Sequence, residues 1–479
     1  MISGDRPTHL LILLSLAGIL ALLSFALWPV FLTSLGREWG LSNTDIGLVS
    51  GAYFLGYLIA TPVLVGLTDR VDARLIFLGG CAFGAAGCLS FALLAHDFWS
   101  AASCWALVGA GLAGTYMPGL QILNARLDDA ARVRSVPWYT ACFGIGTGGS
   151  FALMGVLLAY ADWRLAASLG AGVAVLAAML ILFLVQPCHI APLPANQKKR
   201  HPLDLRPAFR KPVALGYILA YGTHTYELFA FRTWSFALLV FLASRADGSM
   251  GIGAVTTIVS LITVTGMLAS LLGARLCLAF GRHRVIALIG GATALVSVLV
   301  ALSLDGPVWV AVAGLWIYNG FIMLDSGALT TGTVEAGDAY DRGALLAVHS
   351  MIGFGGGALG GPVVGYVLDQ AGGASIMGAW FYALLAMGAD QPLFLLFNGI
   401  SGAGLVEPIP RQTQFANRLA VLNGGVSMCL GRLVVWHCGL AALRQHAFSG
   451  RVMRVLRHHH RARMRPFAPL VYHQNSDVC

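Results

Sequence analysis

The sequence predicts an all-α membrane protein in which twelve transmembrane helices form two six-helix bundles. Hydrophobic residues make up 57% of the 479 residues and charged residues only 11%, whereas soluble domains carry roughly 25% charged residues. The mean hydropathy of +0.76 comes from long apolar runs, which a polar central stretch divides into two sets of six. So few charged residues cannot cover the surface of a protein in water. The composition therefore indicates that most of the chain lies within a bilayer.

The apolar runs are long enough to cross a hydrocarbon core about 30 Å thick as helices. The predicted spans are 9–34, 45–67, 75–95, 98–124, 136–160, 165–186, 213–242, 250–273, 284–304, 307–333, 344–368 and 376–399. The first run lacks a small-residue cleavage pattern, so we expect it to remain as a spanning helix. Helices are expected because lipid offers no partner to an unpaired backbone group, and the alternation typical of outer-membrane barrels is not found.

Basic residues in the connections predict the orientation. Nearly all of them fall on the side of the N-terminus, and the opposite side holds Arg37, Arg164 and Arg245. Because Lys and Arg collect on the cytoplasmic side, we expect a multi-pass protein of a bacterial inner membrane with a cytoplasmic N-terminus. The formal charge of +9 is then a topology signal, and nucleic-acid binding is not needed to explain it.

The predicted domains are an N-terminal bundle, a linker, a C-terminal bundle and a tail. Their ranges are 1–186, 187–212, 213–400 and 401–479. Two related bundles indicate a site between them near mid-membrane. We expect the linker to be a solvated cytoplasmic tether, with recognition of anionic lipid as the alternative. We expect the basic tail to be disordered and cytoplasmic, with lipid-surface binding or metal capture as alternatives.

The connection after the second span carries a specific motif. It reads Gly66-Leu-Thr-Asp69-Arg70-Val-Asp-Ala-Arg74 and resembles the G-x-x-x-D-R-x-G-R-R loop of the major facilitator superfamily. It departs from that loop at Asp72 and Ala73. Gly66 would permit close helix approach, and Asp69, Arg70 and Arg74 would form a gating loop by pairing with neighbouring helix ends.

A degenerate second copy of this motif lies at 273–284, where the Gly and the basic cluster remain but the Asp is missing. The resemblance covers residues 1 to 388 and implies a secondary carrier that works by alternating access. Segments 114–119 and 324–329 are similar to carriers near the cyanate-permease branch. Glycine-rich segments at 144–149 and 353–365 would rock against the other bundle by this resemblance, with ordinary tight packing as the alternative.

The seventh span carries ionisable residues at depth. His224 lies about 17 Å from Val213 along the helix, close to mid-membrane, and Glu227 follows on nearly the same face. A His takes up a proton near physiological pH, and a carboxylate one turn away would stabilise its charged form. We therefore predict a proton-coupling pair, and a polar pair that serves packing alone is the alternative.

Three further charged or titratable residues lie within spans. Asp325 and His349 both fall in the inner third of their helices, so they could form an inner gate or a proton exit, or make a static structural bond. Arg232 lies about 28 Å from the inner boundary. We expect Arg232 to snorkel to the outer interface, with attraction of an anion as the alternative.

The resemblance also implies that spans one, four, seven and ten line a central cavity. The candidate substrate contacts are then Ser24, Trp28, Tyr116, Tyr221, Tyr318 and Asn319. Aromatic rings with a hydroxyl or N–H suit a small organic solute. A packing role is the alternative for each of the six.

Two function classes remain: a proton-coupled secondary transporter of a small solute, and a non-transporting membrane sensor or scaffold. We expect no enzyme, cofactor or metal site, because no Walker loop, Rossmann fingerprint or zinc-spaced Cys/His set occurs. The nine cysteines are scattered, so no disulfide framework is expected. The expected partners are a small-molecule substrate, the lipid bilayer and protons, without nucleic acid, and the expected state is a monomer.

Overall fold

A computed structural model describes residues 7–68, 70–187, 205–246, 250–338 and 341–403. All regular structure in these ranges is α-helical. Twelve helices or helix pairs are long and apolar enough to span a membrane, which confirms the predicted fold class. Most of the predicted linker and nearly all of the predicted tail lie outside the described residues.

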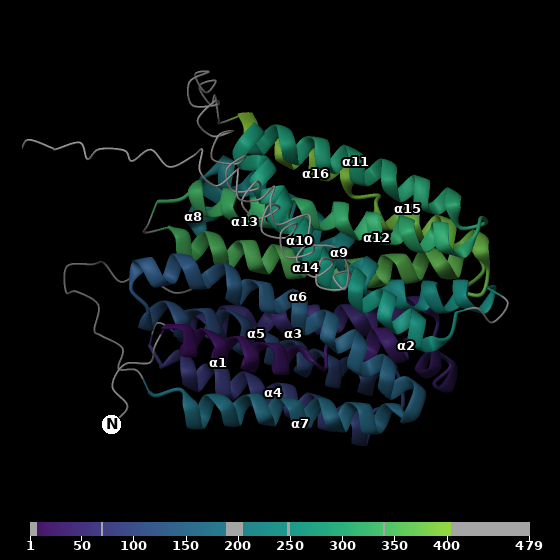
Figure 1. Cartoon of the computed structure of the whole chain (residues 1–479), viewed down its shortest axis with the longest axis horizontal. Coiled ribbons are helices and arrows are strands. Elements are labelled where there is room, and N and C mark those ends of the chain that lie inside the picture. The colour runs from purple at the N-terminus through teal and green to yellow at the C-terminus, as the bar shows by residue number, and fades with distance from the viewer. Residues whose placement is uncertain (1–6, 69, 188–204, 247–249, 339–340, 404–479) are drawn as a thin grey trace, which may run out of the picture. The chain divides into compact units, whose positions relative to one another are not determined.

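The N-terminal bundle contains the first six spans. They are α1 (Pro7–Leu22) with α2 (Leu27–Glu38), α3 (Asn43–Leu67), α4 (Ala73–Leu94), α5 (Phe98–Arg126), α6 (Asp129–Tyr160) and α7 (Trp163–Leu184). In Figure 1 these purple and blue helices lie below the teal and green ones.

The C-terminal bundle begins with the short helix α8 (Arg206–Arg210). Its six spans are α9 (Pro212–Ser244), α10 (Ile252–Phe280), α11 (Arg282–Ser303), α12 (Val308–Leu324) with α13 (Ser326–Glu335), α14 (Arg342–Gln370), and α15 (Met377–Met387) with α16 (Gln391–Ala403). We call the end of the helices that carries α8 the α8 end (left in Figure 1), and the other end, which carries the connections 39–42 and 371–376, the opposite end.

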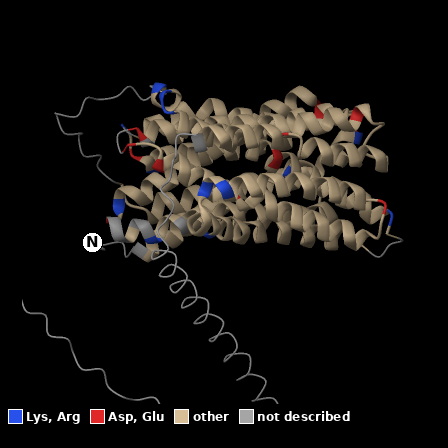
Figure 2. Cartoon of the chain, turned by 90° about the horizontal axis from the view of Figure 1, so that it is seen from above, with Lys and Arg blue, Asp and Glu red and all other residues tan. Residues whose placement is uncertain are grey.

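Side chains in the connections start several of these helices. Asp97, Asp128 and Asp162 each accept a hydrogen bond from a backbone N–H in the first turn of α5, α6 and α7. Ser42 and Asp45 form a reciprocal capping box at the start of α3. Such caps satisfy N–H groups that have no partner inside the helix. Figure 2 shows that most charged residues gather at the two ends of the helices.

Three spans are interrupted inside the bilayer-crossing length. The breaks lie at 23–26 between α1 and α2, at Asp325 between α12 and α13, and at 388–390 between α15 and α16. Asp390 and Gln391, two polar residues within the apolar run of the twelfth span, lie at the last of these breaks. Both side chains are buried, so the break turns them towards the protein interior.

Glycines set the spacing between helices within each bundle. A Cβ added at Gly109 of α5 would lie 1.8 Å from the backbone oxygen of Tyr53 in α3, and one at Gly56 of α3 would lie 1.9 Å from that of Ala106 in α5. The two helices therefore touch backbone to backbone. Close contacts of this kind drive helix association in lipid, where apolar side chains gain little by meeting each other.

We predict that Gly109→Ala lowers the stability of the detergent-solubilised protein by about 1–3 kcal/mol, because the new methyl group would force α3 and α5 apart. The melting temperature, followed by intrinsic fluorescence, measures the change. Gly79→Ala in α4 is the matched control, because a Cβ there meets nothing within 4 Å. An unchanged melting temperature for Gly109→Ala would contradict the packing argument.

Candidate functional site

Among the described residues, the main contacts between the two bundles join α3 with α14, α6 with α10, and α2 with α9. Glycines form the closest contacts here too. A Cβ at Gly365 of α14 would lie 2.1 Å from the oxygen of Asn43, and a Cβ at Gly148 of α6 would lie 2.4 Å from Val264. The glycine-rich segments of α6 and α14 therefore both lie at the interface between bundles.

The glycines of α14 also serve packing within its own bundle. A Cβ at Gly356 would lie 2.0 Å from the oxygen of Gly222 in α9, and one at Gly360 would lie 2.4 Å from that of Tyr226. One face of α14 thus packs on α9, and another face meets α3. Tight packing within the C-terminal bundle and contact with the N-terminal bundle therefore involve different faces of this one helix.

A carboxylate joins the bundles at the opposite end. Asp369 Oδ1 accepts hydrogen bonds from the backbone N–H and the side-chain amide of Asn43, at 3.0 and 2.7 Å. Its Oδ2 accepts from the backbone N–H and the hydroxyl of Thr44, at 2.7 and 2.6 Å. A carboxylate at the N-terminus of α3 satisfies free N–H groups and complements the helix dipole. We call this contact the Asp369 latch.

His224 lies in the C-terminal bundle, against the break in the tenth span. Its Nδ1 is 2.8 Å from Oδ1 of Asp325, and both side chains are buried. The sequence-based pairing of His224 with Glu227 is therefore wrong about the partner. The break between α12 and α13 places the Asp325 carboxylate beside the imidazole instead.

Glu227 has its own set of partners. Tyr318 donates its hydroxyl hydrogen to Oε1 of Glu227 at 2.5 Å, and Gln391 donates from Nε2 to Oε2 at 2.5 Å. Asp390, next to Gln391 in the chain, is 7% exposed, and neither of its carboxylate oxygens has a hydrogen-bond partner among the described residues. Asp390 and Gln391 are missing from the site residues predicted above, although two polar residues within an apolar run are a sequence signal of a polar site.

His349 of α14 completes the cluster. Its ring lies 3.8 Å from the ring of Tyr221, centroid to centroid and nearly parallel, and the Tyr221 ring is also 5.6 Å from that of His224. Thr333 and Thr330 of α13 lie 3.1 and 3.2 Å from its two ring nitrogens. The four predicted proton-coupling residues are thus all buried in the C-terminal bundle. We call these four, with Tyr221, Tyr318, Asp390 and Gln391, the polar cluster.

The remaining predicted substrate contacts lie elsewhere. Trp28 is fully buried and donates its indole N–H to the oxygen of Ile46 at 3.0 Å, and Asn319 donates to the oxygen of Ile262 at 2.8 Å. Ser24 is buried against α7, where a Cβ on Gly170 would come within 3.1 Å of it. Tyr116 stacks on Tyr139 at 6.1 Å. In this conformation Ser24, Trp28 and Asn319 serve helix packing.

The predicted gating loop is described in part, because Asp69 lies outside the described residues. Gly66 is in the last turn of α3, and Arg70 is exposed. Arg74 donates to the backbone oxygens of Leu182 and Ile181 at the end of α7, at 2.6 and 3.3 Å. Arg74 therefore pairs with a neighbouring helix end, as the pattern predicts.

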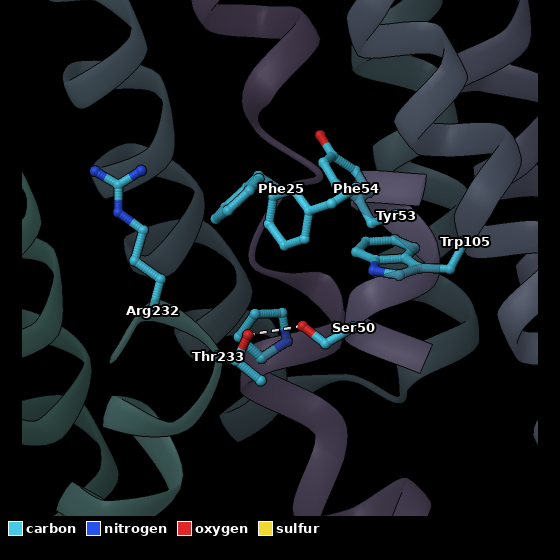
Figure 3. Close-up of a pocket in the computed structure, with 8 residues that line it drawn as sticks. Phe25, Ser50, Tyr53, Phe54, Trp105, Arg232 and Thr233 are labelled. Atoms are coloured by element: carbon cyan, nitrogen blue, oxygen red, sulfur yellow. Dashed lines mark hydrogen bonds between the residues drawn. The ribbon is translucent and has the colours of Figure 1, made fainter. Parts of the chain in front are cut away.

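Arg232 of α9 does not snorkel to an interface. Only 3% of its surface is exposed, and its Nε and Nη1 have no hydrogen-bond partner among the described residues. It lines a small cavity between the bundles (Figure 3). The other lining residues are Phe25, Pro29, Ser50, Tyr53, Phe54, Trp105 and Thr233. The sequence could not reveal this burial, because it depends on aromatic residues from three distant segments.

The described residues contain no group of three or more His, Cys, Asp or Glu side chains arranged to hold a metal ion. The polar cluster offers carboxyl, imidazole, phenol and amide groups, which can transfer protons and form hydrogen bonds.

The chain was compared with known proteins. It is 26% identical over 254 residues to a probable sphingolipid transporter, spinster homolog 2, of Arabidopsis thaliana, which covers 48% of this chain and 51% of that protein. It is 27% identical over 158 residues to protein spinster homolog 1 of Mus musculus, which covers 32% of this chain and 30% of that protein. The chain thus spans about half or less of the length of these curated relatives.

Solved structures share the fold. The nucleoside transporter NupG has a TM-score of 0.66 at 15% identity, over 82% of this chain and 99% of that chain. A bacterial homolog of the human lysosomal transporter Spinster, in an inward-facing and occupied conformation, has a TM-score of 0.65 at 14% identity, over 85% and 100%. The family model described as Major Facilitator Superfamily matches residues 13–361. With that match over most of its length, this chain belongs to the major facilitator superfamily.

Proposed function

We propose that this membrane transporter is a proton-coupled secondary carrier, which moves a small solute across a bacterial inner membrane by alternating access. The observation that carries the proposal is the polar cluster, which places Glu227, Asp390, Asp325 and two histidines inside membrane spans. Ionisable side chains within a bilayer are expensive and mark proton relays or substrate paths. We propose that the carrier acts as a monomer with its N-terminus in the cytoplasm.

The surroundings of Glu227 support proton binding. Its hydrogen-bond partners Tyr318 and Gln391 are neutral donors, and the buried Asp390 carboxylate directly precedes Gln391. A buried carboxylate whose hydrogen-bond partners are neutral is suited to take up and release a proton. Asp325 lies in direct contact with His224, so a second carboxylate and an imidazole are also side by side in this bundle.

The depths of these groups favour a proton path from the α8 end. Counted along their own helices from that end, His349 is about 10 Å deep, Asp325 about 15 Å, His224 about 18 Å and Glu227 about 22 Å. The stacked rings of His349, Tyr221 and His224 connect the shallowest of these groups with His224. The 2.8 Å contact between His224 and Asp325 adds a carboxylate to this series.

Closure at the opposite end supports alternating access. The Asp369 latch and the backbone contact between Gly47 and Gly361, where a Cβ would lie 2.3 Å from the neighbouring oxygen, hold α3 against α14 there. A carrier needs such contacts on one side at a time, and glycine surfaces allow two packed helices to part and rejoin.

Counterflow of labelled solutes in proteoliposomes, with and without a pH gradient, tests the proposed function. We expect at least one small organic solute to accumulate faster when the gradient drives protons in the same direction. Absence of counterflow across a broad solute panel would instead support a non-transporting sensor built on the same fold.

We predict that His224→Ala and Glu227→Gln each abolish uptake driven by the pH gradient and spare solute exchange, because exchange needs no net proton movement. Transport is measured with the solute found in the counterflow screen. His96→Ala and Asp305→Asn are the matched controls, since both residues are exposed in connections. Gradient-driven uptake at the normal rate in both cluster variants would refute the assignment of the proton site.

We predict that Asp369→Asn loosens the opposite end, because an amide can accept fewer of the four hydrogen bonds and lacks the charge that complements the α3 dipole. The readout is maleimide labelling of a cysteine placed at Ser50, which is buried at the interface and hydrogen-bonded to Thr233 at 2.7 Å. Labelling should become several-fold faster in Asp369→Asn and stay unchanged in Asp305→Asn. Equal labelling rates in all backgrounds would show that the latch does not hold the end closed.

A further inference from the structure

Arg232 is a buried cation that forms no ion pair with any residue in the described part of the chain. Two of its three guanidinium nitrogens have no hydrogen-bond partner among the described residues, and its side chain is almost completely buried. The guanidinium carbon lies 5.7 Å from the ring centroids of Phe143 and Phe229. Ring contacts at this distance recover little of the energy lost when a charge leaves water. A buried cation of this kind is expected where a bound anion pairs with its charge.

The space beside Arg232 is built from both bundles. Phe25, Tyr53, Phe54 and Trp105 come from the N-terminal bundle, and Arg232 and Thr233 come from α9 of the C-terminal bundle. In Figure 3 the guanidinium stands at the left beside Phe25, and Trp105 closes the right side. A cationic fork next to an aromatic wall offers one anchor for a charge and one surface for an apolar body.

We infer that this cavity is the subsite that binds the charged group of the transported solute, and that the solute is a small organic monoanion with an apolar or aromatic body. The inference rests on the proposed transport function. The planar guanidinium matches the two oxygens of a carboxylate. Among the described residues that line the cavity, Arg232 is the only cation, which favours a single negative charge over a doubly charged phosphate.

The cavity is too small for such a solute in the present conformation. Its volume is about 10 Å³, which is room for roughly one water molecule. Because its walls belong to different bundles, the cavity enlarges only when the bundles separate near α2, α3 and α9. The solute therefore binds the conformation in which these helices are apart, so binding and bundle movement are coupled.

Binding to the purified full-length protein tests the inference with two matched pairs of probes: benzoate and benzamide, and 3-phenylpropionate and 3-phenylpropionamide. For wild type we expect at least one acid to raise the melting temperature and to bind about tenfold or more tightly than its amide by calorimetry. Arg232→Met should remove this preference. Without ligand, Arg232→Met should melt at a higher temperature than wild type, because an unpaired buried charge has been replaced by an apolar side chain.

Two further variants complete the experiment. Arg232→Lys keeps the positive charge but lacks the planar guanidinium group, so its preference for the acid should lie between those of wild type and Arg232→Met. Arg245→Met is the matched control, because Arg245 is exposed at the end of α9, and it should behave as wild type in binding.

Some outcomes would overturn the inference. These are wild type that binds neither acid, wild type that binds amides as tightly as acids, and Arg232→Met that keeps the preference. Proteoliposome uptake separates this inference from the proposed function. Arg232-dependent binding without any uptake would contradict the proposed transport function but support an anion site. Uptake of anions by Arg232→Met at the wild-type rate would contradict the anion subsite but support the transport function.

Discussion

Lipid cannot hydrogen-bond to a polar group, and the rest of this structure follows from that constraint. Backbone groups pair within helices, and the N–H groups at several helix starts are satisfied by aspartate or serine caps in the connections. Most charged side chains lie at the helix ends, where water and headgroups solvate them (Figure 2). Several of the polar groups that remain inside pair with one another in the C-terminal bundle, as His224 does with Asp325 and Glu227 with Tyr318.

Helix α9 connects the polar cluster with the bundle interface. It is the most buried of the twelve spans. His224 and Glu227 face the interior of the C-terminal bundle, towards Asp325 and Tyr318. Two turns further on, Thr233 hydrogen-bonds to Ser50 of the N-terminal bundle. A change in charge at Glu227 and a change in the packing between bundles therefore act on the same helix, which offers a physical route for coupling.

The breaks within spans have the same origin. A helix that stops inside the bilayer leaves backbone groups without partners, which is tolerated only where the protein covers them. At Asp325 and at 388–390 the breaks lie against other helices of the C-terminal bundle, and the carboxylates there are buried. Each break turns a carboxylate inward. Asp325 and Asp390, which interrupt apolar runs in the sequence, are therefore part of the polar cluster.

The sequence by itself determined the span count, the division into two sets of six and the presence of ionisable residues at depth. Hydropathy and the rise per residue are properties of a single helix, so they can be derived from that helix's own sequence. The tertiary structure decided which groups meet: His224 with Asp325, Glu227 with Tyr318 and Gln391, and Arg232 beneath an aromatic cover. Those contacts depend on the rotation of each helix about its axis and on its neighbours. In a helix that is apolar on all sides, the sequence has almost no periodic pattern that would indicate its rotation or its neighbours.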